Sequence, residues 1–468
     1  MPKPKFIGLD THYRNANGDM QRRIHLDGAA SPLASSVALE TINQLLPHYS
    51  NTHSYVHTSA QITTNALEWA HNQILKFLNA DNKDYTAIFT GAGTTAGINR
   101  IARGLAVARS NKKVVLVSAM EHHANDLPHR QFDNEVHYIP TVGEGAQQGA
   151  IDLVELESLL QQHQDKVNYV AVSAISNVTG IINPITEITR LAHKYDALVL
   201  VDAAQSVAHM QSHLSQNEPS KEVDFIVFSG HKLYTPTAPG VLVAKKNVLE
   251  SLAGQDLGGG SVSDVSYYDY QLLTEFPNKE QSGTPNIVGA IALARVTQEL
   301  ERYGFDKIEK HSHSLINELF EALSSLPNVI IYGDPKSKRL SALSFNHTKI
   351  DHGLLAAILN DYYCIAVRNE CFCAHPYVSS MLKEALWELD LSEIPEDQHT
   401  EFINTKRGMV RVSISLYNDS NDIEKLISAL TEIAKRIENY RPHYDVLPNG
   451  SYKHKSFQND WRKELGWS

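Results

Sequence analysis

Cysteine is scarce in this chain, which has only three among 468 residues. So low a content argues against an oxidising compartment, and the N-terminal MPKPKFIGLDTHYRN lacks the apolar core of an export signal. We therefore expect a cytoplasmic protein. Uninterrupted apolar runs of about 18 residues, the length that spans a bilayer, are also missing, so we expect no membrane segment.

Positive charge is likewise in deficit, because 42 Lys and Arg face 53 Asp and Glu and leave a net charge of −11. Nucleic-acid phosphate is therefore not an expected partner. A small anionic substrate remains compatible, since local positive groups decide its binding. With 42% hydrophobic and 20% charged residues the chain has ample core, and its length suggests two or three domains.

The sequence also lacks a second pair of cysteines. Cys371 and Cys373 are separated by one residue instead of the two of a zinc knuckle, and no other pair completes four ligands. We therefore expect no metal site. A disulfide and a nucleophilic thiol remain as alternatives for this pair.

Short apolar, β-branched runs alternate with segments of helical periodicity in the first two thirds of the chain. The runs cover residues 85–90, 112–119, 136–140, 167–176, 197–204, 223–229 and 240–246. This alternation is typical of βαβ units around a buried, mostly parallel sheet. Ligands of such α/β folds bind at the carboxyl ends of the strands.

The pattern changes after a long helical stretch at about 286–303. We expect a large domain at 27–304, a small α+β domain at 305–441 and an irregular tail at 442–468. Residues 1–26 are expected to form an N-terminal segment that packs with the small domain.

A glycine-rich segment, FTGAGTTAGINR, follows the first strand of the alternating region. With Gly91, Gly93 and the later Glu121 it matches a dinucleotide-binding pattern. Small residues followed by Thr94 and Thr95 at a helix start also present N–H groups and hydroxyls that bind phosphate. A tight turn without a ligand is the alternative.

Two later strands end in polar residues at the same predicted edge. Asp202 and Gln205 follow one strand, and Ser229, His231 and Lys232 follow the next. A desolvated lysine amine is nucleophilic toward an aldehyde, while a hydroxyl and an imidazole suit phosphate. The alternatives are a helix N-cap for the aspartate and a surface lysine.

The segments VDAAQ and, about 25 residues later, SGHK resemble the class V aminotransferase superfamily of pyridoxal 5'-phosphate (PLP) enzymes. The resemblance extends from about His25 to Tyr440 and is to the cysteine desulfurase and selenocysteine lyase branch. It implies an α/β fold of fold-type I, with a mainly parallel seven-stranded sheet in the large domain and a small α+β domain. It also implies a homodimer with the active site at the interface.

The same resemblance implies roles for individual residues. Lys232 would form the internal Schiff base, Asp202 would pair with the pyridine nitrogen, and His122 would stack on the ring. The other residues implied to bind the cofactor are Gly93, Thr94, Thr95, Asn177, Gln205, Ser229, His231 and, toward the neighbouring subunit, Thr284.

The alternating strand in GMVRVSISLYND carries Arg411, whose guanidinium fork matches a substrate carboxylate. Its alternative is a structural salt bridge. By the resemblance, Asn177 would support the same carboxylate, and Arg368 would hold either the cysteine-bearing loop or the substrate.

The segment RNECFCAHP matches the family frame R-x-x-x-x-C-A-x-P, which selects Cys373 as the nucleophile. The implied reaction leaves a persulfide on this cysteine, releases alanine and passes sulfur to a possible acceptor protein. His375 and Arg368 would supply positive potential to the thiol. Cys371 is a second sulfur carrier, a resolving thiol or inert, of which we favour inert, and Cys364 is expected in the core.

Two features differ from familiar desulfurases. Glu370, Cys371 and Phe372 replace Gly-His-His before the nucleophile, and an acidic insertion at 389–401 is a lid, a partner surface or a solvated face. Another class V reaction on a different amino acid (transamination, epimerisation, C–S or β-elimination) is therefore the main alternative. A non-catalytic protein and a nicotinamide-dependent dehydrogenase are more distant ones.

Overall fold

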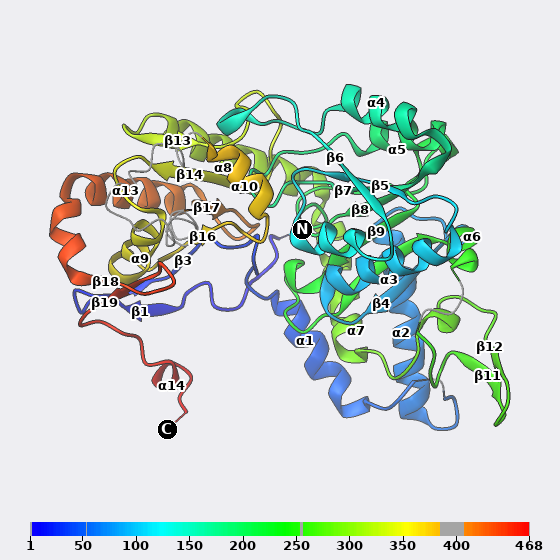
Figure 1. Cartoon of the computed structure of the whole chain (residues 1–468). Coiled ribbons are helices and arrows are strands. Elements are labelled where there is room, and N and C mark those ends of the chain that lie inside the picture. The colour runs from blue at the N-terminus through cyan, green and yellow to red at the C-terminus, as the bar shows by residue number, and fades with distance from the viewer. Residues whose placement is uncertain (1, 53, 253–255, 384–406, 468) are drawn as a thin grey trace.

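The computed structural model describes residues 2–52, 54–252, 256–383 and 407–467. Figure 1 shows a larger part around a central sheet beside a smaller part that contains most of the second half of the chain. The predicted acidic insertion at 389–401 lies outside the described residues.

The large part is built on a seven-stranded sheet of order β4-β10-β9-β8-β7-β5-β6. Only β10 runs antiparallel to its neighbours within this sheet, which confirms the prediction of a mainly parallel, seven-stranded α/β fold. The strands are β4 (Tyr85–Thr90), β5 (Val114–Ser118), β6 (Glu135–Ile139), β7 (Val167–Ser173), β8 (Leu198–Asp202), β9 (Phe225–Ser229) and β10 (Gly240–Lys245).

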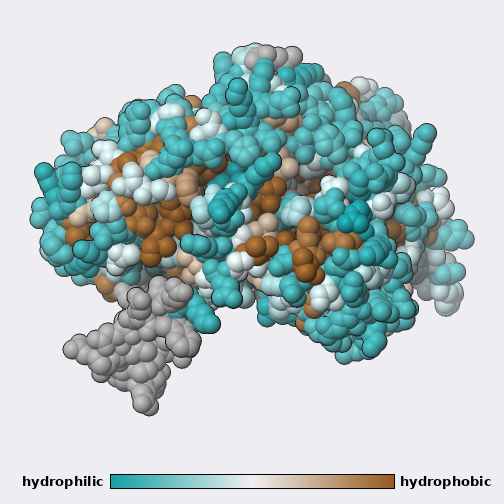
Figure 2. All heavy atoms as spheres, turned by 90° about the horizontal axis from the view of Figure 1, so that it is seen from above, coloured by the Kyte–Doolittle hydropathy of each residue, from teal (hydrophilic) through white to brown (hydrophobic). Residues whose placement is uncertain are grey.

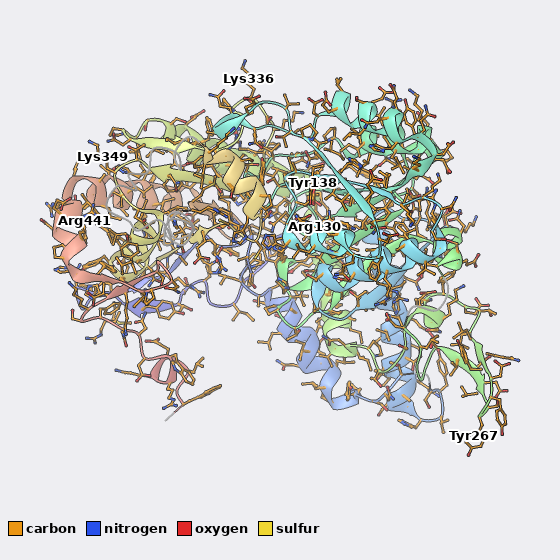
Figure 3. All side chains as sticks on the ribbon, in the orientation of Figure 1. Arg130, Tyr138, Tyr267, Lys336, Lys349 and Arg441 are labelled. Atoms are coloured by element: carbon orange, nitrogen blue, oxygen red, sulfur yellow. The ribbon has the colours of Figure 1, made fainter. Side chains whose placement is uncertain are left out.

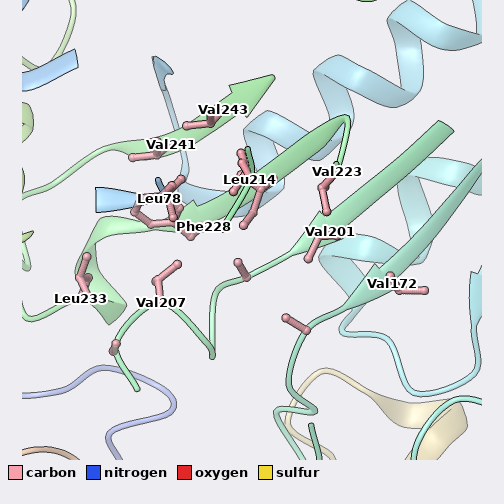
Figure 4. Close-up of a cluster of buried hydrophobic side chains, with 14 of the residues drawn as sticks. Leu78, Val172, Val201, Val207, Leu214, Val223, Phe228, Leu233, Val241 and Val243 are labelled. Carbon is pink, nitrogen blue, oxygen red and sulfur yellow. The ribbon is translucent and has the colours of Figure 1, made fainter. Parts of the chain in front are cut away.

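Helices cover this sheet and explain why its strands are almost wholly apolar. Every residue of β5, β7 and β9 is buried. Figure 4 shows Val172, Val201, Phe228 and Val241 on strands of this sheet, in a buried cluster that also contains Leu78. The helices of this part are α1 (Ser36–Leu45), α2 (Thr58–Phe77), α3 (Gly93–Ala108), α4 (Leu153–His163), α5 (Ile185–Lys194), α6 (Lys246–Ser251) and α7 (Ile287–Tyr303).

The small part has its own antiparallel sheet, of order β13-β14-β17-β16, and its own hydrophobic core. Its strands are β13 (Val329–Ile331), β14 (Ala342–His347), β16 (Arg368–Glu370) and β17 (Met409–Ser413). Its helices are α8 (Phe305–Ser324), α9 (His352–Tyr363), α10 (His375–Met381) and α13 (Ser420–Tyr440).

The N-terminal segment lies against the small part. Strand β3 (Ile24–His25) pairs in parallel with β15 (Ile365–Ala366), and Arg22 forms a 2.6 Å ion pair with Asp422. The same segment folds into the short hairpin of β1 (His12–Arg14) and β2 (Met20–Arg22). The first residues of the chain thus complete a unit whose other elements come from its last third.

The tail differs from the irregular segment that we predicted. Strands β18 (Tyr444–Val446) and β19 (Tyr452–His454) form a hairpin, which the Pro-Asn-Gly turn between them favours, and α14 (Trp461–Glu464) follows. The Tyr362 hydroxyl contacts His443 Nδ1 at 2.6 Å and His454 Nε2 at 3.0 Å. These contacts fasten the hairpin to α9.

A second hairpin, β11 (Val262–Val265) and β12 (Tyr270–Leu272), extends from the large part. Figure 3 shows Tyr267 at its far end, where the side chain is fully exposed. From above, hydrophilic residues cover most of the surface and hydrophobic residues gather in separate patches (Figure 2). Among the described residues, no helix is both long and apolar enough to cross a bilayer.

Candidate active site

A cavity of about 480 Å³ lies at the carboxyl ends of β4, β7, β8 and β9. Parallel strands direct the residues that follow them to one edge of the sheet, which is why separate segments meet here. The predicted site residues in its lining are Gly93, Thr94, Thr95, His122, Asn177, Asp202, Gln205, Ser229, His231 and Lys232.

One end of the cavity is formed by the first residues of α3. The N-cap residue of this 16-residue helix makes no side-chain cap, and Gly93, Thr94 and Thr95 of its first turn line the cavity, where the positive end of the helix dipole favours an anion. Ser229 Oγ accepts a 2.8 Å hydrogen bond from the Thr94 N–H and lies 2.8 Å from Thr94 Oγ1. Gly93 has a φ of +58°, and a Cβ there would lie 2.5 Å from Ser229 Oγ. Glycine is therefore the residue that fits this turn.

Both Asp202, which is buried, and Lys232, which is half-buried, lie in the cavity wall. Burial raises the pKa of Asp202, while the Ala204 N–H, 2.8 Å from Oδ1, and Lys232 oppose this shift. Burial lowers the pKa of Lys232, and Asp202 opposes that shift. Lowering its pKa favours the neutral amine, which is the nucleophilic form of lysine. Asp202 caps a local turn, as the alternative held, and lines the cavity as well.

His122 lies on the cavity wall as a neutral ring. Its Nδ1 accepts a 3.0 Å hydrogen bond from the Ala124 N–H. Burial first, and then the charges of Lys232 and His123, lower its pKa to about 3. A neutral imidazole suits stacking on a flat aromatic group, the role that the resemblance implied.

The side chains of Gln205 and Thr284 each donate a hydrogen bond to a neighbouring segment. The Gln205 amide donates to the Ala29 carbonyl at 2.8 Å, which fixes the side chain at the cavity wall. Thr284 lies outside the cavity and donates to Asn51 at 3.3 Å. A role at the cavity of its own subunit is therefore excluded, and a contribution to a second subunit stays a prediction.

Glu121 corrects the dinucleotide interpretation, in which it would have bound a ribose. The carboxylate is buried and accepts hydrogen bonds from Ser118 Oγ, from Asn125 Nδ2 at 2.7 Å and from the Ser173 N–H at 2.8 Å. Burial raises its pKa to about 7 despite these donors. It supports Ser173, a cavity residue that the sequence reading missed because no motif singles it out.

Arg411 lies on β17 with 3% of its surface exposed. Its Nη2 is 3.3 Å from Asp27 Oδ1, and its Nη1 donates to the Asn177 carbonyl at 2.9 Å. Burial lowers its pKa to about 10, which Asp27 opposes. Its buried Nε has no hydrogen-bond partner among the described residues. The salt bridge of the alternative interpretation therefore exists, and the guanidinium keeps one buried N–H without a partner among the described residues.

Arg368 is exposed and stands opposite Arg411 in the β16–β17 ladder. Its charge contributes to the lowered pKa of Arg411. The structure thus places Arg368 beside Arg411, at the start of the cysteine-bearing loop.

The loop after β16 exposes Cys373 and is held by main-chain contacts to the cavity wall. The Cys373 carbonyl accepts from the His123 N–H at 2.7 Å, and the Phe372 carbonyl accepts from Asn177 Nδ2 at 2.8 Å. Cys373 is among the groups that oppose the lowering of the pKa of Lys232 and of Arg411 by burial. The loop that carries the predicted nucleophile is thus joined to the cavity wall through Asn177.

This loop contains three non-glycine residues in the left-handed region. The φ angles are +85° at Glu370, +52° at Phe372 and +54° at Cys373. Side chains with a Cβ adopt this region only at a cost of about 1 kcal/mol or more each. The loop is thus strained at and next to its exposed thiol.

The other two cysteines are buried. Cys371 Sγ lies 3.5 Å from the Arg407 carbonyl, and burial raises its pKa to about 11. A thiol with so high a pKa is a poor nucleophile, which supports the inert interpretation. Burial also raises the pKa of Cys364, in line with its predicted core position.

His123 and His375 form a stacked pair that the sequence reading missed. Their ring centroids are 4.9 Å apart, and His123 Nε2 is 3.1 Å from His375 Nδ1. Burial and the neighbouring His375 lower the pKa of His123. This pair joins the segment after His122 to the start of α10.

Comparisons with known proteins agree with one another. The sequence profile described as "Aminotransferase class-V" matches residues 24–426. A "Probable cysteine desulfurase" from Halalkalibacterium halodurans is 33% identical over 87% of this chain and 92% of its own length. A "Probable cysteine desulfurase" from Staphylococcus aureus is 32% identical over 88% of this chain and 92% of its own length.

Solved structures show the same fold. A cysteine desulfurase from Thermococcus onnurineus in its apo form superposes with a TM-score of 0.76 at 29% identity, covering 88% of this chain and 95% of its own. The cysteine desulfurase CsdA (S-sulfonic acid) from Escherichia coli gives 0.72 at 26% identity, with the same coverage of both chains.

Proposed function

This chain belongs to the class-V aminotransferase family, and we propose that it is a PLP-dependent cysteine desulfurase that takes sulfur from L-cysteine onto Cys373. Relatives named as desulfurases match over most of both chains. The observation that carries the proposal is the exposed thiol on a loop bonded to the wall of the Lys232 cavity.

The residues of the cavity fit PLP. The uncapped start of α3, with Thr94 and Ser229, would hold the phosphate, Lys232 would take the aldehyde, and Asp202 would keep the pyridine nitrogen protonated. When bound, this cofactor supplies an electron sink for a carbanion of the amino-acid substrate. The neutral ring of His122 would cover one face of it and fix its plane.

The substrate would be oriented by Arg411, whose free Nε–H and buried guanidinium match a carboxylate. Asn177, between Arg411 and the cysteine-bearing loop, would support the same end. The substrate sulfur would then point toward the loop that carries Cys373.

The sulfur step is a displacement at the substrate sulfur. The Cys373 thiolate forms an S–S bond while the bond between that sulfur and the substrate carbon breaks, and the carbon keeps the electron pair and takes up a proton. Thiol and L-cysteine thus become persulfide and L-alanine without an added oxidant or reductant. Exposure of Cys373 would let an acceptor protein collect the sulfur.

The wider assignment follows from the same family. We propose a cytoplasmic homodimer in which Thr284 approaches the cofactor phosphate of the second subunit, and L-selenocysteine as a further substrate. Domain limits of 27–304 and 305–441 are part of this proposal. They agree with the separate hydrophobic core of the small part.

The decisive experiment feeds L-cysteine to the purified holoenzyme and measures alanine, enzyme-bound persulfide and keto acid together. We expect alanine and persulfide in equal amounts in a first turnover, and neither from Cys373→Ser. Cys371→Ser is the matched control and should keep activity within about twofold, because its thiol is buried and protonated.

Keto acid without persulfide, or full alanine formation by Cys373→Ser, would instead show a different class V reaction. Glu370 and Phe372 at the family's Gly and His positions are the features that favour this second candidate.

A further inference from the structure

We propose that Phe372 is a positioning residue that couples carboxylate binding at Arg411 to the placement of the Cys373 thiol. This inference rests on the proposed function and assigns a role that comes from this chain's own phenylalanine. Phe372 is the residue directly before the nucleophile, and only 8% of it is exposed.

Three contacts form a closed circuit between the substrate anchor and the cysteine-bearing loop. Arg411 Nη1 donates to the Asn177 carbonyl at 2.9 Å, and Asn177 Nδ2 donates to the Phe372 carbonyl at 2.8 Å. The Phe372 ring closes the circuit, since its centroid lies 4.7 Å from the central guanidinium carbon. The positions of Arg411, Asn177 and Phe372 therefore depend on one another.

The ring and a carboxylate do not compete for the guanidinium. A cation over an aromatic ring is held through the face of the guanidinium plane, whereas a carboxylate takes N–H donors in the plane. The Nε–H remains without a partner among the described residues and is such an in-plane donor. A bound carboxylate thus fixes the guanidinium and, through the ring, the loop.

The loop needs this fixing because its backbone is strained. Phe372 and Cys373 both adopt left-handed φ angles, which cost free energy unless surrounding contacts compensate. The ring contact and the Asn177 hydrogen bond hold Phe372, while the His123 N–H holds the Cys373 carbonyl. Loss of the ring would let Cys373 leave its position while the cavity around Lys232 stays intact.

The test replaces Phe372 by Leu, which stays apolar but has no aromatic face, and by Tyr, which keeps the face. For Phe372→Leu we expect single-turnover persulfide formation to slow about tenfold, while binding of L-alanine changes less than about twofold. Phe372→Tyr should restore the rate. A purely structural defect would lower the folded fraction and reduce binding and rate together.

A second measurement does not depend on turnover. Cys373 is the exposed cysteine among three, so iodoacetamide should label it selectively in the folded protein. We expect saturating L-alanine to slow labelling several-fold in the wild type and not in Phe372→Leu. L-alanine methyl ester, which lacks the carboxylate, is the matched ligand and should not protect the thiol.

The outcomes separate the inference from the function on which it rests. If the wild type forms no persulfide from L-cysteine, the proposed function fails. If the wild type does so and Phe372→Leu keeps both its rate and its protection by L-alanine, only the coupling role of Phe372 is wrong.

A separate cluster leads us to infer a zinc-type metal site on the far edge of the large sheet. Glu135 and His137 lie on one face of the edge strand β6, and His163 is the last residue of α4. One ligand atom from each side chain lies within 4.8 Å of the others, the only such group among the described residues.

The chemistry of the cluster fits a divalent cation with nitrogen and oxygen ligands. Two imidazoles and one carboxylate are a common zinc ligand set, in which ligand atoms stand about 3.3 Å apart around the ion. The rings of His137 and His163 are already 4.2 Å apart, and His163 Nε2 is buried without a hydrogen-bond partner among the described residues. Small side-chain rotations would bring the three ligand atoms to this spacing. The positive charge of Lys166 nearby would oppose the binding of a cation.

Zinc titration of the holoenzyme tests this second inference, with Cys373 alkylated beforehand so that its thiol does not bind the metal. We expect the wild type to bind one more zinc ion per chain than His163→Ala and Glu135→Gln, with unchanged thermal stability in the absence of zinc. His12→Ala, which removes an exposed histidine elsewhere, should match the wild type. Equal stoichiometry in all four proteins would overturn the site.

Discussion

Two regions of the candidate site differ in how the chain builds them: the cavity that contains Lys232, here the cofactor half, and the loop after β16 that carries Cys373, here the sulfur half. The cofactor half uses the ends of buried parallel strands and the start of a 16-residue helix, where a single glycine takes the left-handed conformation. The sulfur half is a surface loop in which three residues with side chains take that conformation. The first region is fixed by the core of the fold, whereas the second depends on a few local contacts.

The two regions therefore differ in how far their residues can move during a reaction. Residues on strand ends cannot move without disturbing the sheet, so the cofactor half is suited to a fixed ring and phosphate. A loop held by main-chain bonds to Asn177 and His123 can shift its thiol by small steps. Substitutions in the two halves should therefore have different consequences.

The largest contrast is expected between Lys232→Ala and Cys373→Ser. Loss of the amine should abolish every reaction with amino acids, because Lys232 is the lysine in the lining of the cavity. Cys373→Ser should abolish persulfide formation and leave L-alanine binding intact. Absorbance spectra with L-alanine check this, with exposed Lys425→Ala as the control; equal loss of binding in both variants would break the distinction.

A smaller effect is expected from glycine substitutions in the cofactor half. Gly93→Ala would combine a positive φ with a contact of 2.5 Å to Ser229, and we expect the PLP Kd to rise roughly 10- to 100-fold. Gly91→Ala meets nothing within 4 Å and should change the Kd by less than about threefold. Equilibrium dialysis of PLP measures both, and similar losses would contradict the geometry of this turn.

Glu121, beneath the cofactor half, predicts a pH dependence of stability. Its pKa rises on folding from 4.5 to about 7 through burial, so the folded state keeps a proton that the unfolded chain releases. Its contribution to stability is complete below pH 4.5 and is lost as pH rises toward 7.

Urea unfolding of wild type and Glu121→Gln at pH 5 and pH 7.5 tests this dependence. The neutral amide does not titrate, so the variant should gain about 1 to 3 kcal/mol relative to the wild type between the two pH values. Parallel pH profiles would show that the carboxylate is ionised in the fold.

The smallest effect concerns strain in the sulfur half. Glu370→Gly should raise the free energy of unfolding by about 1 kcal/mol, because glycine adopts a φ of +85° without steric cost. Asn369→Gly, one residue earlier in β16, should lower it by about 0.5 to 1 kcal/mol. Denaturation of both variants measures the sign of the change in the free energy of unfolding. If both substitutions stabilise or both destabilise the protein, the proposed strain at Glu370 is wrong.

The sequence was sufficient for the cofactor half because its residues follow strands with a strong apolar pattern. Asp202 and Lys232 could be placed at one sheet edge from the alternation alone, and the family resemblance supplied their roles. The tail hairpin was missed since its strands have three residues each, too few for a periodic signal. Seven apolar runs of five or more residues, by contrast, left little ambiguity.

Contacts between distant segments could not be predicted from the sequence. Asp27, Asn177 and Phe372 surround Arg411 from three separate parts of the chain, and no local pattern relates them. The pairing of His123 with His375 has the same origin. The role of Glu121 was open as well, because a carboxylate after a strand can face a ligand or support the backbone, and only packing decides between them.

The pairing of the N-terminal segment with the small part has a consequence for synthesis of the chain. Asn15 donates to the Tyr362 carbonyl, a partner 347 positions later. At about 5 to 20 residues per second, the first strands must wait roughly 20 to 70 s on the ribosome before their partners are made. The large sheet is translated entirely within that interval, so the nascent protein should form its cofactor half before its first residues find a place.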